Sequence, residues 1–503
     1  MKNMNKHFSF VVALVLALAM FTTAFAGELV VAQPADAVSL DPHRTNDSAS
    51  AQIIGQIYER LVRLSPEMTI VPCLATEWTQ VDELTLEFKL REGVMFHNGD
   101  ELKASDVKFT FDRHINPETA APAAFMLTTV KEVQVVDDYT VRFIAKSPTA
   151  SLLYNLSHED MGILSERAVT EAGDNYASQP VGTGSLKFDS WKKNQEIVMV
   201  KHDAYWGEPA KSDKVTMRII PESATAIAEL QTGGIDVLLN VGSHYQPMFV
   251  EGTGMKLEQF NTFTVKYLGF DIRQKPFDDV RVRQAFNYAV NKDVIVKVAY
   301  ANSAMPLSGP LADKINGYNP DLTPYAYNVE KAKALLAEAG YADGITTTLY
   351  ISDKEVDTKI ATVLQAQLKD VGVTVDIQVL EWGAFLQETS KGLPLFLLGW
   401  TTVTADADNG MYSNFHSTAW GSQGNRVFYK NEKVDELLDL GRAEFDQDAR
   451  AKLYQEASQI IYDDAPWSFL VAETYRVGLR DNVEGFVSMP TCTFPLANMY
   501  VNR

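Results

Sequence analysis

Residues 275–289 read Lys-Pro-Phe-Asp-Asp-Val-Arg-Val-Arg-Gln-Ala-Phe-Asn-Tyr-Ala, and the apolar members of this stretch recur at helical spacing. The pattern predicts a helix over about 279–290 with one buried face. We expect Arg281 and Arg283 at the surface or in ion pairs rather than at a ligand. The predicted buried face consists of Phe277, Val280, Val282, Ala285, Phe286 and Ala289.

Strand and helix patterns mix closely on both sides of this stretch. Asn46 and Asp47 are possible N-caps for the first helix, and Gly340 fits a left-handed C-cap. No linker rich in Pro, Gly or Ser divides the chain, so we expect lobes joined by strand crossovers rather than independent domains. Further helices are predicted over 48–64, 223–232, 329–339, 357–371 and 433–444, and strands over 84–90, 133–135, 141–143, 373–377 and 394–398.

Composition places the chain among globular proteins. It has 503 residues, 46% of them hydrophobic and 22% charged, which excludes disordered, collagenous and disulfide-dense classes. The length suggests about three structural units. A formal net charge of −20 argues against nucleic-acid binding, because such binding depends on clustered Lys and Arg.

The first 26 residues have the pattern of a signal peptide. Lys2 and Lys6 precede the apolar run 8–21, and Ala24-Phe25-Ala26 supplies the small residues that a signal peptidase reads. The alternative, a membrane anchor, needs a run of about 17 or more apolar residues, which this segment barely approaches. No Cys lies near the cleavage site, so no lipid anchor is expected. We predict cleavage before Gly27 and a free mature protein in a periplasm-like space.

Two cysteines, Cys73 and Cys492, remain in the mature chain. An oxidising compartment permits a disulfide between them, while two buried free thiols are the plainer interpretation. Their separation in sequence does not decide between the two.

No set of catalytic residues is found. The eight His are scattered without metal-ligand spacing, and there is no G-x-S-x-G nucleophile motif. The S-x-x-K at 190–193 lacks the other motifs of a β-lactamase and precedes a predicted strand. The acidic run 406–410 fails as a calcium loop because His416 stands where the bidentate Glu belongs. We therefore predict no metal, no cofactor and no enzymatic activity, and a binding function instead.

The stretch 275–289 closely resembles the signature of extracellular solute-binding proteins of the peptide/nickel type, which serve ABC importers. Segments at 90–99, 106–109, 180–184, 230–236 and 331–341 resemble further blocks of that family in the same order. The resemblance covers essentially all of 27–503, and the chain is identified as a member.

The resemblance implies an α/β, two-lobed periplasmic-binding-protein fold of the hinge-closing type II, with an extra subdomain in the first lobe. Lobe I would take 27–265 and include the inserted subdomain at about 65–185. Lobe II would take 266–480, and the tail 481–503 would return to lobe I.

The resemblance also bears on the ligand. Peptide-binding relatives carry an Asp three residues after a Gly-Trp pair, where it holds the peptide α-ammonium. Here Gly399-Trp400 is followed at that position by Val403, so the usual anchor is missing. The run from Gly399 to Asp408 is more similar to the glutathione-binding branch, as is the ending over 464–490. Di- or oligopeptides, nickel chelates, sugars and other solutes remain alternatives.

The candidate site is taken partly from the family and partly from side-chain chemistry. Trp400 could stack on the ligand or pack in the core, and Asp406 and Asp408 could accept an ammonium or form a solvated turn. Arg44 suits a ligand carboxylate, although an ion pair within its lobe is equally plausible. Tyr58 and Tyr267 are weaker candidates that could belong to the core. The full predicted set is Arg44, Asn46, Asp47, Tyr58, Tyr267, Trp400, Thr401, Thr402, Thr404, Asp406 and Asp408.

The sequence thus predicts a periplasmic receptor that captures glutathione or a short peptide-like solute between two lobes. It would deliver that solute to the transmembrane subunits of an ABC permease and act as a monomer. A secreted hydrolase, a chaperone-like protein and a sensor for a membrane receptor are the other classes considered.

Overall fold

The computed structural model describes residues 27–502 and shows an α/β protein. Within those residues, one mixed sheet of eleven strands runs through the whole molecule, in the order β15-β14-β16-β12-β17-β11-β1-β10-β9-β8, with β13 paired to β17. Its strands are β1 (Glu28–Gln33), β8 (Leu186–Lys192), β9 (Glu196–Lys201), β10 (Lys214–Ile219), β11 (Val237–Leu239), β12 (Met255–Phe270), β13 (Met305–Pro306), β14 (Ile345–Ser352), β15 (Val373–Leu380), β16 (Leu395–Thr401) and β17 (Trp467–Arg480).

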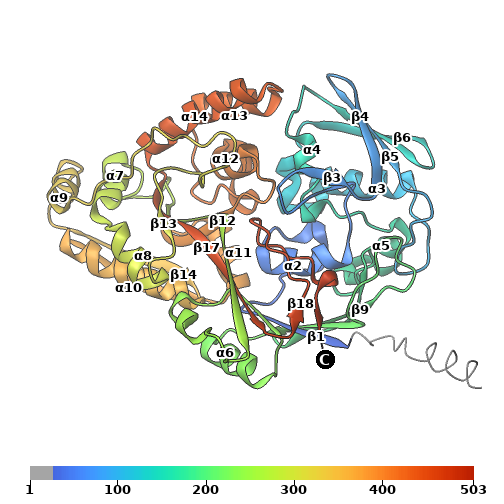
Figure 1. The fold of residues 1–503 in the computed structure, drawn as a ribbon. Coiled ribbons are helices and arrows are strands. Elements are labelled where there is room, and N and C mark those ends of the chain that lie inside the picture. Colours follow the sequence, from blue (N-terminus) through green and yellow to red (C-terminus); the bar gives the residue numbers. More distant parts are fainter. Residues whose placement is uncertain (1–26, 503) are drawn as a thin grey trace, which may run out of the picture.

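Two long antiparallel strands, β12 and β17, connect the halves of the molecule (Figure 1). One end of β17 pairs with β11 at Val477–Leu479, and the other end of β12 pairs with β16. The register shifts between Asn261 and Val265. We propose the boundary between lobe I and lobe II at this irregularity. The chain then rejoins the lobe I sheet within β17, before the predicted tail begins at 481.

A separate four-stranded sheet lies within the span predicted as the insert, in the order β4-β5-β7-β6. Its strands are β4 (Ala75–Asp82), β5 (Thr85–Leu90), β6 (Val130–Asp137) and β7 (Thr140–Ala145). The predicted strands over 84–90, 133–135 and 141–143 are confirmed, and the last two pair as the antiparallel strands β6 and β7. Two short pairs complete the sheets, β2 (Val62–Leu64) with β3 (Ile70–Pro72) and β18 (Val483–Glu484) with β19 (Tyr500–Val501).

Helices cover the sheets, and five of the six helices predicted from the sequence begin and end within two residues of their predicted limits. The helix predicted over 48–64 is shorter, because Tyr58 adopts an extended backbone and Val62 enters β2. The helices are α2 (Ser48–Ile57), α3 (Ala104–Ile115), α4 (Leu152–Asn155), α5 (Glu166–Ala172), α6 (Ser223–Thr232), α7 (Val280–Ala289), α8 (Lys292–Tyr300), α9 (Val329–Glu338), α10 (Glu355–Asp370), α11 (Trp382–Lys391), α12 (Ala407–Phe415), α13 (Glu432–Ala443) and α14 (Gln447–Asp464).

The stretch that opened the sequence forms α7, and Asp279 caps its N-terminus by accepting from the Arg281 amide. Five of the six apolar residues predicted for the buried face are buried. The prediction is wrong for Val280, which lies in the first helical turn and is 36% exposed. Arg281 pairs with Asp279 at the surface. Arg283 is buried instead, and donates to backbone carbonyls of Phe277 and Asp464.

The segment at 180–184 makes a close backbone contact. A Cβ on Gly182 would lie 2.1 Å from the carbonyl oxygen of Ile57, which leaves no room for a side chain. Ser190 of the S-x-x-K lies in β8, a strand, and Lys193 lies in the turn after it, so the motif does not open a helix and the β-lactamase interpretation is removed.

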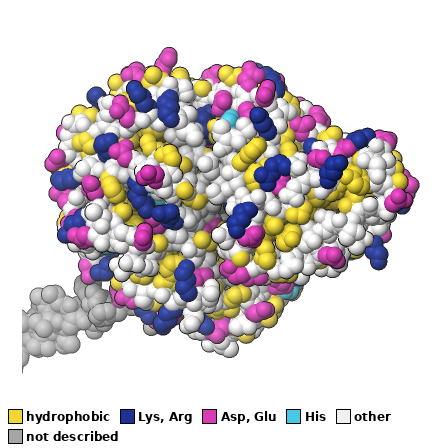
Figure 2. Space-filling view, turned by 180° about the vertical axis from the view of Figure 1, so that it is seen from behind, with side chains coloured by type: hydrophobic (Ala, Val, Ile, Leu, Met, Phe, Trp, Pro, Cys, Tyr) yellow, Lys and Arg dark blue, Asp and Glu magenta, His cyan; other side chains and the backbone are white. Residues whose placement is uncertain are grey.

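Cys73 and Cys492 are free thiols, so the disulfide alternative is wrong. Among the described residues, no helix is long and apolar enough to cross a membrane. The predicted signal peptide lies outside them. Seen from behind, acidic and basic side chains are interspersed, so this face carries no continuous basic stripe that would suit nucleic acid (Figure 2).

Candidate ligand-binding site

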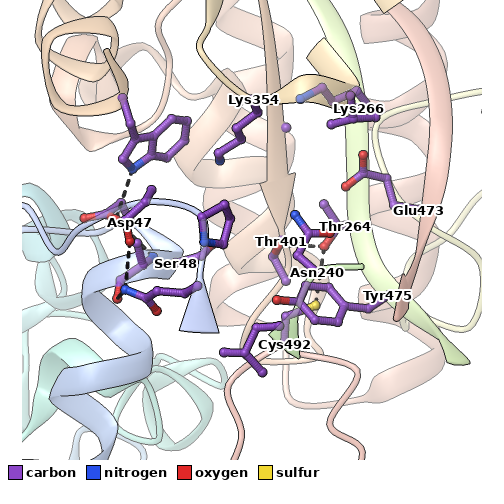
Figure 3. A pocket seen from close by; sticks show the side chains of 18 of the residues that line it. Asp47, Ser48, Asn240, Thr264, Lys266, Lys354, Thr401, Glu473, Tyr475 and Cys492 are labelled. Carbon is purple, nitrogen blue, oxygen red and sulfur yellow. Dashed lines mark hydrogen bonds between the residues drawn. The ribbon is translucent and has the colours of Figure 1, made fainter. Parts of the chain in front are cut away.

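A cavity of ≈ 270 Å³ lies between the lobes, with walls from both. Lobe I contributes the start of α2, the loop after β11 and the C-terminal segment around Cys492. Lobe II contributes the end of β16, the start of α10 and the start of α11. Asp47 and Ser48 face Glu473 and Tyr475 across this space (Figure 3). A ligand inside would therefore touch both lobes, which is the requirement for ligand-stabilised closure.

Lys354 lies on the upper side of the cavity in Figure 3, beside Lys266. Its ammonium lies 3.4 Å from the centroid of the Trp382 ring, and it forms no ion pair within 4.0 Å among the described residues. Burial lowers the pKa of Lys354, while nearby Asp357 acts in the opposite direction. A ligand carboxylate would supply the partner that this ammonium lacks.

Lys266, the neighbouring lysine, is already neutralised. Its ammonium pairs with the buried carboxylate of Asp357, which also accepts 2.7 Å from the Ser352 hydroxyl. Of these two lysines, only Lys354 has a charge available for a ligand.

Glu473 presents a carboxylate from β17, across the cavity from Asp47 and Ser48 (Figure 3). The Tyr300 hydroxyl donates to one of its oxygens, and burial, followed by the charge of Glu473, raises the pKa of Tyr300 well above its usual value. Glu473 makes no ion pair within 4.0 Å among the residues described. It is therefore a possible acceptor for a ligand ammonium.

The start of α2 joins the two lobes at the cavity. Asp47 caps the helix by accepting from the amides of Ala49 and Ser50, and the same oxygen accepts 3.2 Å from the Trp382 indole of lobe II. Asn46 donates 3.0 Å to the carbonyl of Ser422. Both predicted residues thus lie where the lobes meet.

Trp400 and Thr401 also line the cavity, at the end of β16. The indole nitrogen of Trp400 has no hydrogen-bond partner among the described residues, and the Thr401 hydroxyl lies 2.7 Å from that of Thr264. Val403 belongs to the same wall. The residue that replaces the expected amine anchor therefore lines the cavity.

Comparison with known proteins places the chain in a family. A model described as bacterial extracellular solute-binding proteins, family 5 (middle region), matches residues 69–422. The glutathione-binding protein GsiB of Pectobacterium atrosepticum is 33% identical over 480 residues, covering 93% of each chain, and that of Escherichia coli K12 is 31% identical over 501 residues, covering 97% of this chain and 98% of its own. This chain is a family 5 solute-binding protein.

Solved structures of the family share its fold. The periplasmic binding protein DppA from Helicobacter pylori, in complex with the peptide STSA, superimposes with a TM-score of 0.92 at 32% identity, covering 95% of this chain and 99% of its own. AppA from Bacillus subtilis, in complex with a nonapeptide, gives 0.89 at 26% identity with the same coverage. The predicted two-lobed α/β fold is confirmed, and so is a binding rather than enzymatic role.

The two acidic residues after Trp400 have structural partners. Asp408 forms a two-pronged pair with Arg442, at 2.9 Å for each bond, and Asp406 pairs with Arg450. Both carboxylates are buried in lobe II and neither lines the cavity. The geometry therefore corrects the expectation that they hold a ligand ammonium, because their charges are already neutralised.

Five other predicted residues also lie outside the cavity lining. Tyr58 bonds to Tyr176 within the lobe I core, and Tyr267 stacks on Trp467 with ring centroids 3.5 Å apart. Arg44 is exposed at the surface. Thr402 and Thr404 are buried. The structure thus brings Asn46, Asp47, Trp400 and Thr401 together at the cavity, and the other seven predicted residues do not line it.

Sequence reasoning missed Lys354 and Glu473. Lys354 lies two residues after the end of β14 and directly before α10, and this strand-to-helix junction with a cation was a usable signal. Glu473 lies within β17, where nothing in the local pattern separates it from any other polar strand residue. Within residues 27–502, no cluster of His, Cys, Asp and Glu could hold a metal ion.

Proposed function

We propose that this protein is the periplasmic receptor of an ABC importer and captures glutathione or a short peptide-like zwitterion between its lobes. The supporting observation is the cavity shared by both lobes, with unpaired groups of opposite sign at Lys354 and Glu473. Lys354 would hold a ligand carboxylate and Glu473 an ammonium. Asn46, Asp47, Trp400 and Thr401 would complete the contacts.

Delivery to the transmembrane subunits of a permease and secretion with removal of residues 1–26 belong to the same proposal. The name of the GsiB relatives favours glutathione. The apolar Val403 on the cavity wall argues in the same direction, because an ordinary dipeptide loses its expected amine anchor. We further propose a monomer.

A di- or oligopeptide is the second candidate, because two structural neighbours were solved with peptides bound. Thermal unfolding with a ligand panel distinguishes the candidates. Reduced or oxidised glutathione at millimolar concentration should raise the melting temperature more than Ala-Ala, a hexapeptide or a nickel–histidine chelate. A ligand at a hundredfold excess over its Kd stabilises the folded state by about 2.7 kcal/mol.

A response to Ala-Ala or the hexapeptide alone would replace glutathione by a peptide and leave the receptor role standing. Absence of any response across the panel would count against both candidates.

A further inference from the structure

Buried arginines in the described chain use the two-pronged edge of the guanidinium, formed by Nε and Nη2, on nearby acceptors. In Arg442 these two nitrogens donate to the Asp408 carboxylate, and in Arg283 they donate to the Asp464 carbonyl. Arg450 and Arg476 likewise find acceptors for both nitrogens. This is the usual solution for a buried cation, whose donors are costly to leave without partners.

Arg426 departs from this pattern. Its Nη1 donates 2.6 Å to the Leu386 carbonyl and 2.8 Å to the Thr389 hydroxyl, both on α11. Among residues 27–502, neither its Nε nor its Nη2 has an acceptor, and no carboxylate lies within 4.0 Å of the guanidinium. Arg426 is nevertheless only 6% exposed and lines the cavity. One edge of the group is thus fixed by α11 while the pairing edge is free.

The free edge has the geometry of a carboxylate site. Nε and Nη2 of a guanidinium donate two parallel hydrogen bonds that match the two oxygens of a carboxylate. Burial lowers the pKa of Arg426, which agrees with a charge that lacks a partner in the protein. The bonds to Leu386 and Thr389 hold the guanidinium in place before a ligand arrives.

Arg426 and Lys354 both lie beside α11. Lys354 sits over the ring of Trp382 at the start of the helix, and Arg426 bonds to residues one to two turns further along. We infer that the cavity is built for a ligand with two carboxylates, one held by the Arg426 edge and the other by Lys354. This inference rests on the proposed function and narrows its ligand class, since glutathione has two free carboxylates and Ala-Ala has one.

Masking one carboxylate at a time tests the assignment. The probes are glutathione, its glycyl ethyl ester, and 4-aminobutyryl-Cys-Gly, which lacks only the α-carboxylate of the glutamyl residue. Calorimetric titration of the unmodified protein should show each mask weakening binding at least tenfold. In Arg426→Gln, one of the two modified ligands should bind within threefold of glutathione, because the carboxylate it lacks no longer has its partner. In Lys354→Met, the other modified ligand should do so.

Arg426→Lys keeps the charge without the paired donors. It should restore part of the difference in affinity between glutathione and the modified ligand, and it serves as the test if the Gln variant does not fold. Arg283→Gln is the matched control, because Arg283 is equally buried and lies away from the cavity. The Arg283→Gln variant should show the same loss of affinity for each modified ligand as the unmodified protein.

The inference is overturned if either mask is harmless in the unmodified protein, or if both remain equally costly in the Arg426 variants. Binding of Ala-Ala without binding of glutathione would also overturn it, while leaving the receptor role intact. If neither glutathione nor Ala-Ala nor a hexapeptide bound, the proposed function would fall with it.

Discussion

Val403 shows how one side chain can bear on ligand choice. It lines the cavity beside Trp400, and its amide donates 3.1 Å to the Asn409 side chain, which fixes the backbone at the end of β16. The apolar side chain offers nothing to an ammonium. Glu473, a cavity carboxylate that makes no ion pair among the described residues, enters from another strand.

We predict that Val403→Asp improves the binding of free-amine dipeptides such as Ala-Ala. A carboxylate on the cavity wall would add a charge-assisted hydrogen bond of about 1.5–3 kcal/mol, and thus about a tenfold or greater gain in affinity. Calorimetric titration of Ala-Ala measures the change. Val403→Asn is the control for size and polarity without charge, and an equal gain in both variants would show that charge is not the cause.

At the scale of elements, α12 is tied to the two helices that follow it by buried ion pairs. Asp406 caps α12 and pairs with Arg450 of α14, while Asp408 pairs with Arg442 of α13. Arg442 also donates 2.9 Å to the hydroxyl of Thr128 in the insert, so it holds lobe II against lobe I. Removing one member of such a pair leaves a buried charge without its counter-ion.

Asp408→Asn should therefore lower the free energy of unfolding by about 3–5 kcal/mol, measured by urea denaturation. Glu436→Gln on the exposed face of α13 removes a surface partner of Lys433 and should cost under about 1 kcal/mol. If Asp408→Asn left stability unchanged and weakened glutathione binding, Asp408 would return to the ligand site.

At the scale of the whole molecule, direct hydrogen bonds join the two lobes. Trp382 of lobe II donates to Asp47 of lobe I beside the cavity, and the Ala150 amide donates 2.9 Å to the Arg442 carbonyl. The Asp47 carboxylate keeps its helix-capping bonds if the indole is removed. The interlobe bond can therefore be removed with little effect on α2.

We predict that Trp382→Phe weakens ligand binding about five- to tenfold, because the loss of one interlobe hydrogen bond of about 1 kcal/mol disfavours closure. The aromatic ring beneath Lys354 is retained. Trp191→Phe is the matched control, since the Trp191 indole donates 3.1 Å to Asp36 within lobe I. Titration with glutathione, or with Ala-Ala if that is the ligand, gives the affinities, and equal losses in the two variants would contradict an effect on closure.

The sequence by itself determined features that depend on neighbours along the chain. The apolar spacing in 275–289 identified α7 and most of its buried face, and Asp47 was identified as a cap because its partners are two and three residues away. The ordered blocks identified the family, and Asn46 and Trp400, both predicted for the site, line the cavity.

Only the tertiary structure decided which charges are free for a ligand. Asp406 and Asp408 follow Trp400 closely, yet their partners Arg450 and Arg442 come more than thirty residues later and neutralise them. Lys354, Arg426 and Glu473 come from separate elements and share a cavity because the sheet and the crossover strands bring them there. Local spacing encodes helices, strands and caps, whereas the availability of a buried charge depends on which opposite charge folding places within about 4 Å.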